Sequence, residues 1–121
     1  MDAVLSEENI FACARTLILE DGELSLQVSA AGIKVRFPTT RRIAEHMDVP
    51  HYYVLPYFAG LETQGFLTRT ERVGIFTTPA GTRRLFSGMS EDELARVKSV
   101  CGNDLCRLIL AAGKQSLFLP N

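Results

Sequence analysis

The feature that most constrains the fold is a pair of short helical segments joined by a three-residue turn. Apolar residues recur at helical spacing over 41–47 and again over 51–64, which predicts a helix of two turns followed by a longer one. Asp48-Val49-Pro50 separates them, because the residue before a proline avoids helical angles. Gly65 suits a left-handed stop of the second helix. The residues expected to face inward are Ile43, Ala44, Met47, Val54, Phe58 and Leu61.

Two hairpins are predicted, one on each side of the helix pair: the first from alternating apolar and polar residues, the second from segments rich in β-branched and aromatic residues. The first spans 24–37 and turns at Ser29-Ala30-Ala31-Gly32. The second joins 66–69 to 73–77 through the charged tip Thr70-Glu71-Arg72. Together with the helices, these hairpins predict a mixed α+β domain.

Further helical segments complete the chain. Acids in the first turn favour a helix over 7–20, and a short helix is predicted over 79–86. A capping box at Ser90 starts the last helix, predicted over 90–112. Gly102-Asn103 lies in its middle and favours a break, because glycine costs about 1 kcal/mol in a helix interior.

Composition and charge describe one folded domain over residues 1–121, with 46% hydrophobic and 22% charged residues. The net charge of -1 hides an uneven distribution: residues 34–89 hold eight Lys or Arg against four acids, whereas residues 1–33 hold one Arg against six. A local positive excess suits contact with phosphates. No apolar run is long enough to span a bilayer, and acids stand where a secretory signal has basic residues. A cytoplasmic protein without a membrane partner is expected.

The order of the predicted elements is that of a helix-turn-helix followed by a β-wing. In such a unit the second helix enters the major groove of double-stranded DNA, with its amino-terminal residues nearest the bases, while flanking groups hold phosphates. The residues expected to contact DNA are Thr39, Thr40, Arg41 and Arg42 at phosphates, His51, Tyr52, Tyr53 and Tyr57 in the groove, and Arg69 and Arg72 on the wing.

Residues 39–85 carry a family resemblance. The run from Thr40 through Pro50 to Leu67 resembles the winged helix-turn-helix core of bacterial transcriptional regulators. Its spacing resembles the IscR-like redox regulators, while Thr77-Thr78-Pro79-Ala80-Gly81 is more similar to MarR-type and PadR-type proteins. The resemblance implies operator binding as a homodimer and repression or activation of a few genes.

The predicted second helix departs from that pattern. Pro56 has no amide and clashes with the preceding turn, so either the helix kinks or its regular part begins at Leu55. Groove-facing positions are aromatic, proline or small, which leaves van der Waals contact, tyrosine hydroxyls and DNA shape as means of specificity. The alternative is a winged-helix interaction module in a larger assembly, without direct DNA binding. Its exposed aromatic patch would comprise Tyr52, Tyr53, Pro56 and Tyr57.

The flanking segments predict a homodimer. Helices 7–20 and 90–112 lie outside the DNA-reading unit, and pairing them across a two-fold axis would bury their wide apolar stripes. Leu117-Phe118-Leu119 is expected to cover the partner. The 24–37 hairpin is an addition to a minimal winged helix, and it is either a dimer element or, as favoured here, a widening of the wing's sheet. The expected fold is thus a winged helix-turn-helix with an extra N-terminal β-hairpin and flanking dimerisation helices.

The sequence contains few residues that could bind a cofactor or catalyse a reaction. The IscR-like resemblance implies an iron-sulfur cluster on three closely spaced cysteines after the wing, but only Cys101 and Cys106 lie there, and Cys13 is distant. Structural thiols and no cofactor are therefore expected. His46 and His51 lack companions at zinc-ligand spacing, so no metal site is predicted. Without a phosphate loop, nucleophile elbow or HExxH helix, catalysis is not expected.

Overall fold

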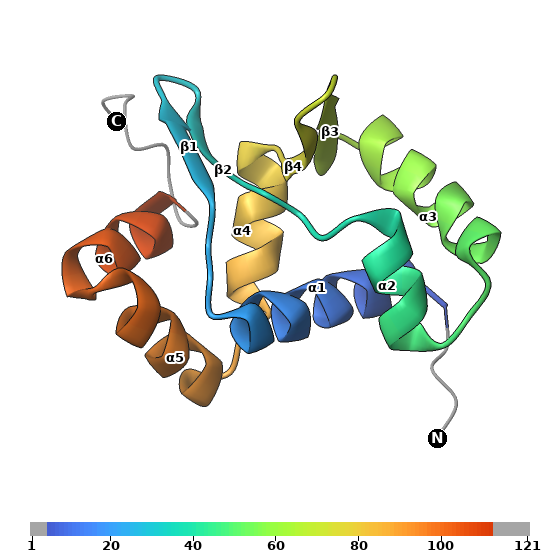
Figure 1. The fold of residues 1–121 in the computed structure, drawn as a ribbon. Coiled ribbons are helices and arrows are strands. Elements are labelled where there is room, and N and C mark those ends of the chain that lie inside the picture. The colour runs from blue at the N-terminus through green and yellow to red at the C-terminus, as the bar shows by residue number, and fades with distance from the viewer. Residues whose placement is uncertain (1–4, 113–121) are drawn as a thin grey trace.

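The computed structural model describes residues 5–112, and their side chains as far as residue 109. Over this range the chain has a mixed α+β fold of six helices and two antiparallel hairpins, as the sequence predicts. No helix in the described range is long and apolar enough to cross a lipid bilayer. In chain order the elements are α1 (Glu7–Asp21), β1 (Leu26–Ser29), β2 (Gly32–Val35), α2 (Thr40–Met47), α3 (His51–Thr63), β3 (Leu67–Thr70), β4 (Gly74–Thr77), α4 (Pro79–Ser87), α5 (Glu91–Cys101) and α6 (Asn103–Ala112) (Figure 1).

Helix α1 lies across the middle of the molecule, with α2 and α3 on one side and α5 and α6 on the other (Figure 1). The Ser6 hydroxyl caps its start, and Gly22 ends it in the left-handed region at φ 65°. Its apolar stripe is buried within the chain's own core, and its exposed positions are Glu8, Ala12, Glu20 and Asp21. No apolar face of α1 is left for a second copy, so the expected pairing of this helix across a two-fold axis does not fit the structure.

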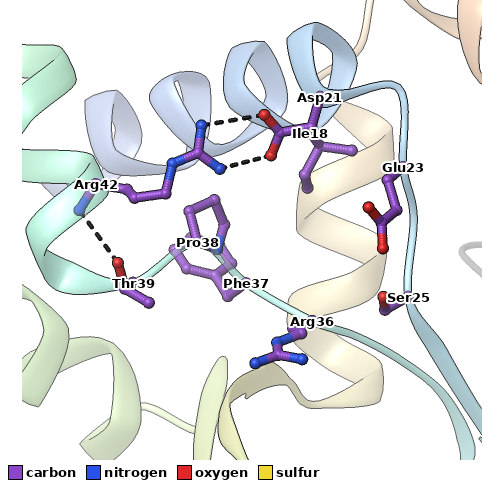
Figure 2. Close-up of a pocket in the computed structure, with 9 residues that line it drawn as sticks. All are labelled: Ile18, Asp21, Glu23, Ser25, Arg36, Phe37, Pro38, Thr39 and Arg42. Carbon is purple, nitrogen blue, oxygen red and sulfur yellow. Dashed lines mark hydrogen bonds and ion pairs between the residues drawn. The ribbon is translucent and has the colours of Figure 1, made fainter.

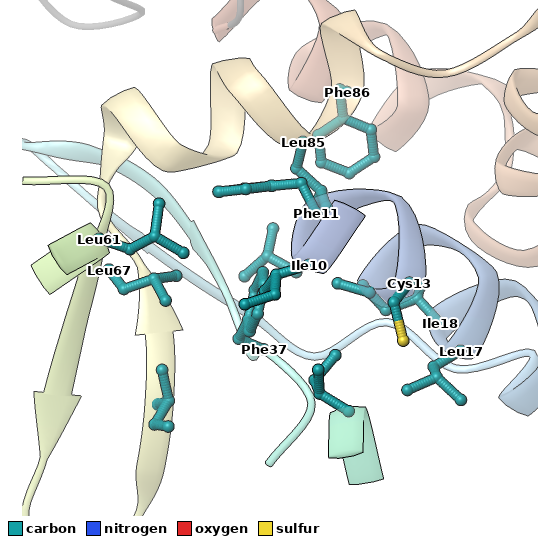
Figure 3. Close-up of a cluster of buried hydrophobic side chains, with 14 of the residues drawn as sticks. Ile10, Phe11, Cys13, Leu17, Ile18, Phe37, Leu61, Leu67, Leu85 and Phe86 are labelled. Carbon is teal, nitrogen blue, oxygen red and sulfur yellow. The ribbon is translucent and has the colours of Figure 1, made fainter. Parts of the chain in front are cut away.

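Aromatic rings join α1 to the helix pair through the core. The Phe37 ring meets those of Phe11 and Phe58 edge-on, at centroid distances of 5.4 Å and 5.8 Å. Figure 3 shows the part of this cluster around Phe11, Phe37 and Leu61. Burying each such side chain contributes about 1.5–3 kcal/mol, so the core fixes where α3 sits.

The predicted helix pair is confirmed. Asp48 ends α2 with a left-handed φ of 56°, and α3 begins directly after Pro50. Val54, Phe58 and Leu61 are fully buried, as the helical spacing predicts. The turn between the two helices therefore consists of Asp48, Val49 and Pro50, the connection that the sequence predicts.

Helix α3 is unbroken from His51 to Thr63 and holds Pro56 in its interior. The alternative in which the regular part begins at Leu55 is therefore wrong. Because proline has no amide, the Tyr52 carbonyl lacks the α-helical bond from residue 56. Both Tyr52 and Pro56 are exposed, so water can satisfy that carbonyl and the helix tolerates the proline.

The two hairpins form separate two-stranded sheets, which corrects the favoured prediction of one wider sheet. Pairing of β1 with β2 runs from Leu26↔Val35 to Ser29↔Gly32. Beyond β2 one isolated bridge, Arg36↔Phe76, joins the chain to β4, and the Phe37 amide donates to the Ile75 carbonyl at 2.8 Å.

A buried chain of threonine hydroxyls replaces the missing ladder between β2 and β4. The Val35 amide donates to Thr77 Oγ1 at 2.8 Å, and Thr77 Oγ1 lies 2.7 Å from Thr82 Oγ1, which donates to the Ile33 carbonyl at 2.6 Å. Each hydroxyl supplies one proton and accepts one, so the chain is fully satisfied. Side-chain hydroxyls, rather than a backbone ladder, therefore attach β2 to β4 and α4.

The predicted break at Gly102 is confirmed, with α5 ending at Cys101 and α6 starting at Asn103. Gly102 has a φ of 83°, a conformation that favours glycine. The capping box at Ser90 is also present. The expected partner-covering segment Leu117-Phe118-Leu119 lies outside the described residues.

A buried arginine connects α1 to α4. Arg15 Nε donates to the Leu85 carbonyl at 2.7 Å, and its Nη2 donates to the Arg84 carbonyl at 2.9 Å. These carbonyls belong to the last turn of α4, where helix acceptors lack partners and the dipole favours a cation. Burial lowers the pKa of Arg15 from its usual value. The two carbonyl acceptors hold the guanidinium in place.

Candidate nucleic-acid interface

The first half of α3 presents an apolar and aromatic surface. Tyr52, Tyr53 and Leu55 are 65%, 48% and 41% exposed, and the two tyrosine rings meet edge-on at 4.7 Å. Helix α3 contacts α2 and β3, the two elements expected to hold phosphates, and its contact with β3 lies at the opposite end of α3, where Glu62 pairs with Arg69. A surface rich in tyrosine suits either the floor of a groove or a protein partner.

Tyr57 is half-buried and packs against the core. Its place on α3 is therefore less open to a groove than that of Tyr52 and Tyr53. The sequence groups the three tyrosines, but the structure brings only the first two together.

Threonines at the start of α2 hold the helix pair in place. The Thr39 hydroxyl accepts from the Arg42 amide at 3.2 Å and caps α2. Thr40 Oγ1 lies 2.7 Å from His51 Nε2, which joins the first residue of α2 to the first residue of α3. These side chains fix the angle between the two helices, and only their remaining hydrogen-bonding capacity is open to a phosphate.

Arg42 forms an ion pair with Asp21 at the end of α1. Its Nη1 and Nη2 donate to the two carboxylate oxygens at 2.5 Å and 3.1 Å (Figure 2). These hydrogen bonds hold the pKa of Asp21 below its usual value and raise the pKa of Arg42. A phosphate must therefore compete with Asp21 for this guanidinium.

Arg69 on β3 is paired in a similar way. Its Nη2 donates to Glu62 Oε1 on α3 at 2.7 Å, and its Nε donates to the same oxygen at 3.2 Å. Two of the four arginines predicted to hold phosphates are thus neutralised by acids from neighbouring elements.

Arg41 and Arg72 are exposed and form no ion pair within the described part of the chain. Arg41 lies in the first turn of α2, and Arg72 lies at the tip of the β3–β4 hairpin with a left-handed φ of 66°. These two side chains keep their whole positive charge available to a ligand.

Arg36 is a further cation that the sequence reasoning did not single out. It follows β2 directly, and its Nη2 donates to the Val73 carbonyl at the tip of the second hairpin, at 3.0 Å. The sequence gives little reason to select Arg36, because it occupies one more polar position in a segment that alternates apolar and polar residues. In the structure it places a third exposed cation beside the tip.

A cleft of about 250 Å³ opens beside these residues, between the end of α1 and the segment that enters α2 (Figure 2). Acids and arginines line it in equal number, with Asp21 and Glu23 facing Arg36 and Arg42. The Arg42–Asp21 pair spans part of it, so the cleft carries no net excess of charge.

The cysteines form no metal site in the described residues, where no three His, Cys, Asp or Glu side chains gather. Burial raises the pKa of the Cys13 thiol to about 11, and burial also raises the pKa of Cys101. Both thiols therefore stay protonated at neutral pH, whereas metal binding and redox exchange require the thiolate.

Comparisons with known protein families, with curated proteins and with solved structures find no match for this chain. The case for a function therefore depends on the contacts and charges described above.

Proposed function

We propose that this chain is a winged-helix protein that binds double-stranded DNA as a homodimer and regulates transcription. The observation that carries the proposal is the exposed aromatic face on the first half of α3, together with two exposed cations, Arg41 and Arg72, that have no ion-pair partners in the described residues. The cations belong to α2 and to the hairpin that follows α3. In the proposed complex α3 enters the major groove and the arginines hold phosphates on its two sides.

The arrangement of the elements supports this proposal. Helices α1, α2 and α3 are followed by the β3–β4 hairpin, which is the order of a helix-turn-helix with a wing. The Arg36↔Phe76 bridge ties the segment before α2 to that hairpin. The helix pair and the hairpin are thereby held together by backbone contacts as well as by the core.

The salt dependence of DNA binding tests the proposal quantitatively, because the number of phosphate contacts sets its slope. Each phosphate neutralised contributes about -0.9 to the slope of log affinity against log salt. If Arg41 and Arg72 act in both protomers, the slope is about -3.6, and recruitment of Arg42 and Arg69 from their acids would double it to about -7. Fluorescence anisotropy of a labelled mixed-sequence duplex, between about 50 and 200 mM salt, measures this slope.

Single variants locate the contacts. Arg72→Ala and Arg41→Ala should each reduce the slope by about 1.8 in a dimer and weaken binding to all sequences alike. Arg107→Ala is the matched control, because this exposed arginine lies on α6 at the other end of the molecule (Figure 1). Equal slopes for all three variants would remove Arg41 and Arg72 from the site.

A tyrosine variant tests base readout. Tyr53→Ala should change which sequences are selected from a random duplex library, while Tyr53→Phe keeps the ring and separates stacking or shape from the hydroxyl. If both variants select the same sequences as the wild type, the exposed face of α3 does not read DNA bases.

The same face favours a second candidate function, a protein-interaction module. Tyr52, Tyr53 and Leu55 are all exposed on the first half of α3, and tyrosines anchor protein interfaces well because they bury a large area at low entropic cost. Absence of duplex binding even at about 50 mM salt would make this module the better explanation.

A further inference from the structure

The β1–β2 hairpin projects beyond α4, with β1 on its outer side (Figure 1). Val28 on this strand is 57% exposed, and Gln27 and Ser29 are exposed as well. β1 pairs with β2 alone among the described strands. Its other edge therefore has no strand partner among residues 5–112.

The hydrogen-bonding phase of the hairpin shows which backbone groups face outward. The Arg36 amide donates to the Ser25 carbonyl at 2.9 Å, so Ser25 and Arg36 are a hydrogen-bonded pair in the observed register. Bonded and non-bonded pairs alternate along an antiparallel ladder. It follows that Leu26 and Val28 direct their amides and carbonyls away from β2.

The opposite edge of the hairpin is already used. The outward amide of Val35 donates to Thr77, and the outward carbonyl of Ile33 accepts from Thr82. The apolar face of β2 also packs on α4 and α6. Of the two edges of this hairpin, only that of β1 keeps two amides and two carbonyls without a described partner.

Natural edge strands usually carry charges, prolines or bulges that prevent pairing. β1 has none of these, and no charged residue lies between Glu23 and Lys34. The strand is therefore open to pairing, and charge does not oppose its meeting an identical copy.

We propose that β1 pairs antiparallel with β1 of a second copy, about a two-fold axis at Gln27, to form a four-stranded sheet across the homodimer. In this register Leu26 lies opposite the second copy's Val28, and the two pairs make four backbone hydrogen bonds. The apolar side chains meet on one face and the two Gln27 amides meet on the other.

The free edge is self-complementary, which favours a second copy over another partner. In this register both outward residues, Leu26 and Val28, form hydrogen-bonded pairs with the second copy. A shift by two residues would pair one of them with its own counterpart and would place the other opposite a turn or loop residue. The Lys34 ammoniums would lie three strand spacings apart, about 14 Å, which exceeds the Debye length of about 10 Å. The proposal rests on the homodimer part of the proposed function and replaces α1 as the pairing element.

Cysteine cross-linking tests the register. At the two-fold axis the two residues 27 form a non-hydrogen-bonded pair with Cα atoms about 4.5 Å apart, within the range of a disulfide. Gln27→Cys, in a Cys101→Ser background, should give a covalent dimer under mild oxidation. Ser29→Cys is the matched control, because its counterpart lies about 13 Å away in this register. Equal cross-linking of both variants, or none, overturns the proposal.

Sedimentation equilibrium of the full chain without DNA tests the interface itself. Val28→Pro removes an outward amide without removing a bond inside the hairpin, and should raise the dimer dissociation constant at least tenfold. Val100→Lys places a charge on the exposed face of α5 and should leave the dimer unchanged. Dissociation by Val100→Lys but not by Val28→Pro would overturn the proposal in favour of helix pairing.

The two proposals fail in different ways. A monomeric wild-type protein that still shifts duplex DNA overturns strand pairing and leaves DNA binding standing. A dimer that cross-links at position 27 but binds no DNA supports strand pairing and removes the proposed regulator.

Discussion

The two hairpins have strands of the same length but differ in what surrounds their edges. The β3–β4 hairpin carries Glu71 and Arg72 at its tip, and Arg69 on β3 pairs with Glu62. The β1–β2 hairpin turns through two alanines and has Lys34 as its one charged residue. Secondary structure alone does not distinguish them, but their charges suit the first to a polyanion and the second to another strand.

Both hairpins are attached to the body at their bases. Strand β2 is held by the hydroxyls of Thr77 and Thr82, and the base of β3–β4 by the close approach of α4 to the Phe66 carbonyl. This comparison predicts that the attachments govern stability, whereas the tips and edges govern binding. Four substitutions test this division, and the largest expected effect comes first.

Gly81→Ala should break the attachment of the second hairpin. A Cβ at this position would collide with the Phe66 carbonyl oxygen, which is backbone and accepts from the Thr78 amide at 3.0 Å. We expect a loss of about 3 kcal/mol in the free energy of unfolding, measured by urea denaturation.

Gly60→Ala in α3 is the matched control for this change. Its added Cβ would meet only the movable ends of two side chains, Glu7 at 3.0 Å and Gln64 at 3.8 Å. Since alanine favours a helix, the control should be neutral or more stable by up to about 1 kcal/mol. A similar loss in both variants would show that the Phe66 contact is not the cause.

Thr77→Val should loosen the first hairpin from the second. It leaves the buried Val35 amide without an acceptor, for which we expect a loss of about 2 kcal/mol in unfolding free energy. Thr82→Val should cost a similar amount. Because the two hydroxyls belong to one chain, the double variant should lose less than the sum, and strict additivity would contradict the shared chain.

Arg36→Ala should loosen only the tip of β3–β4. It removes the hydrogen bond to the Val73 carbonyl, and because Arg36 is exposed the unfolding free energy should fall by less than about 1 kcal/mol. Hydrogen exchange of the tip amides should nevertheless become faster. Lys34→Ala on β2, two residues before Arg36, is the control and should leave exchange at the β3–β4 tip unchanged.

Asp21→Asn should have the smallest effect on stability, below about 1 kcal/mol, because the pair with Arg42 is exposed. The pKa of Asp21 is lowered in the folded state, so its stabilising contribution is present above the ordinary aspartate pKa and is lost as the pH falls through the folded value. Denaturation curves of wild type and variant should therefore converge below about pH 4.

The same substitution sharpens the proposed DNA contact. Without its carboxylate partner Arg42 is free, so duplex affinity at low salt should rise and the salt slope should steepen by up to about 1.8 in a dimer. An unchanged slope would mean that Arg42 does not reach a phosphate.

Local signals predict the elements of this fold well. Helical spacing placed α2 and α3 within one residue of their observed ends, and Gly102 marked the break between α5 and α6. Each of these depends on neighbours a few residues apart in the chain. The alternating residues over 24–37 likewise specified a hairpin and its turn.

Contacts between segments that are distant in the chain could not be predicted from these local sequence patterns. The pairing of Arg42 with Asp21 depends on how α1 crosses α2, and no spacing rule relates residues 21 apart. The threonine chain that attaches β2 to β4 and α4 likewise joins segments more than 40 residues apart. Sequence could therefore nominate four arginines for phosphate contact, but only the structure distinguishes the two that are paired with acids.

Pro56 gives α3 a property that no side chain supplies. Residue 56 has no amide to donate to the backbone oxygen of Tyr52, and both residues are exposed. A backbone acceptor of this kind is held by the helix, so its position does not depend on a side-chain rotamer. Replacing the proline with alanine would close this acceptor while leaving every neighbouring side chain in place.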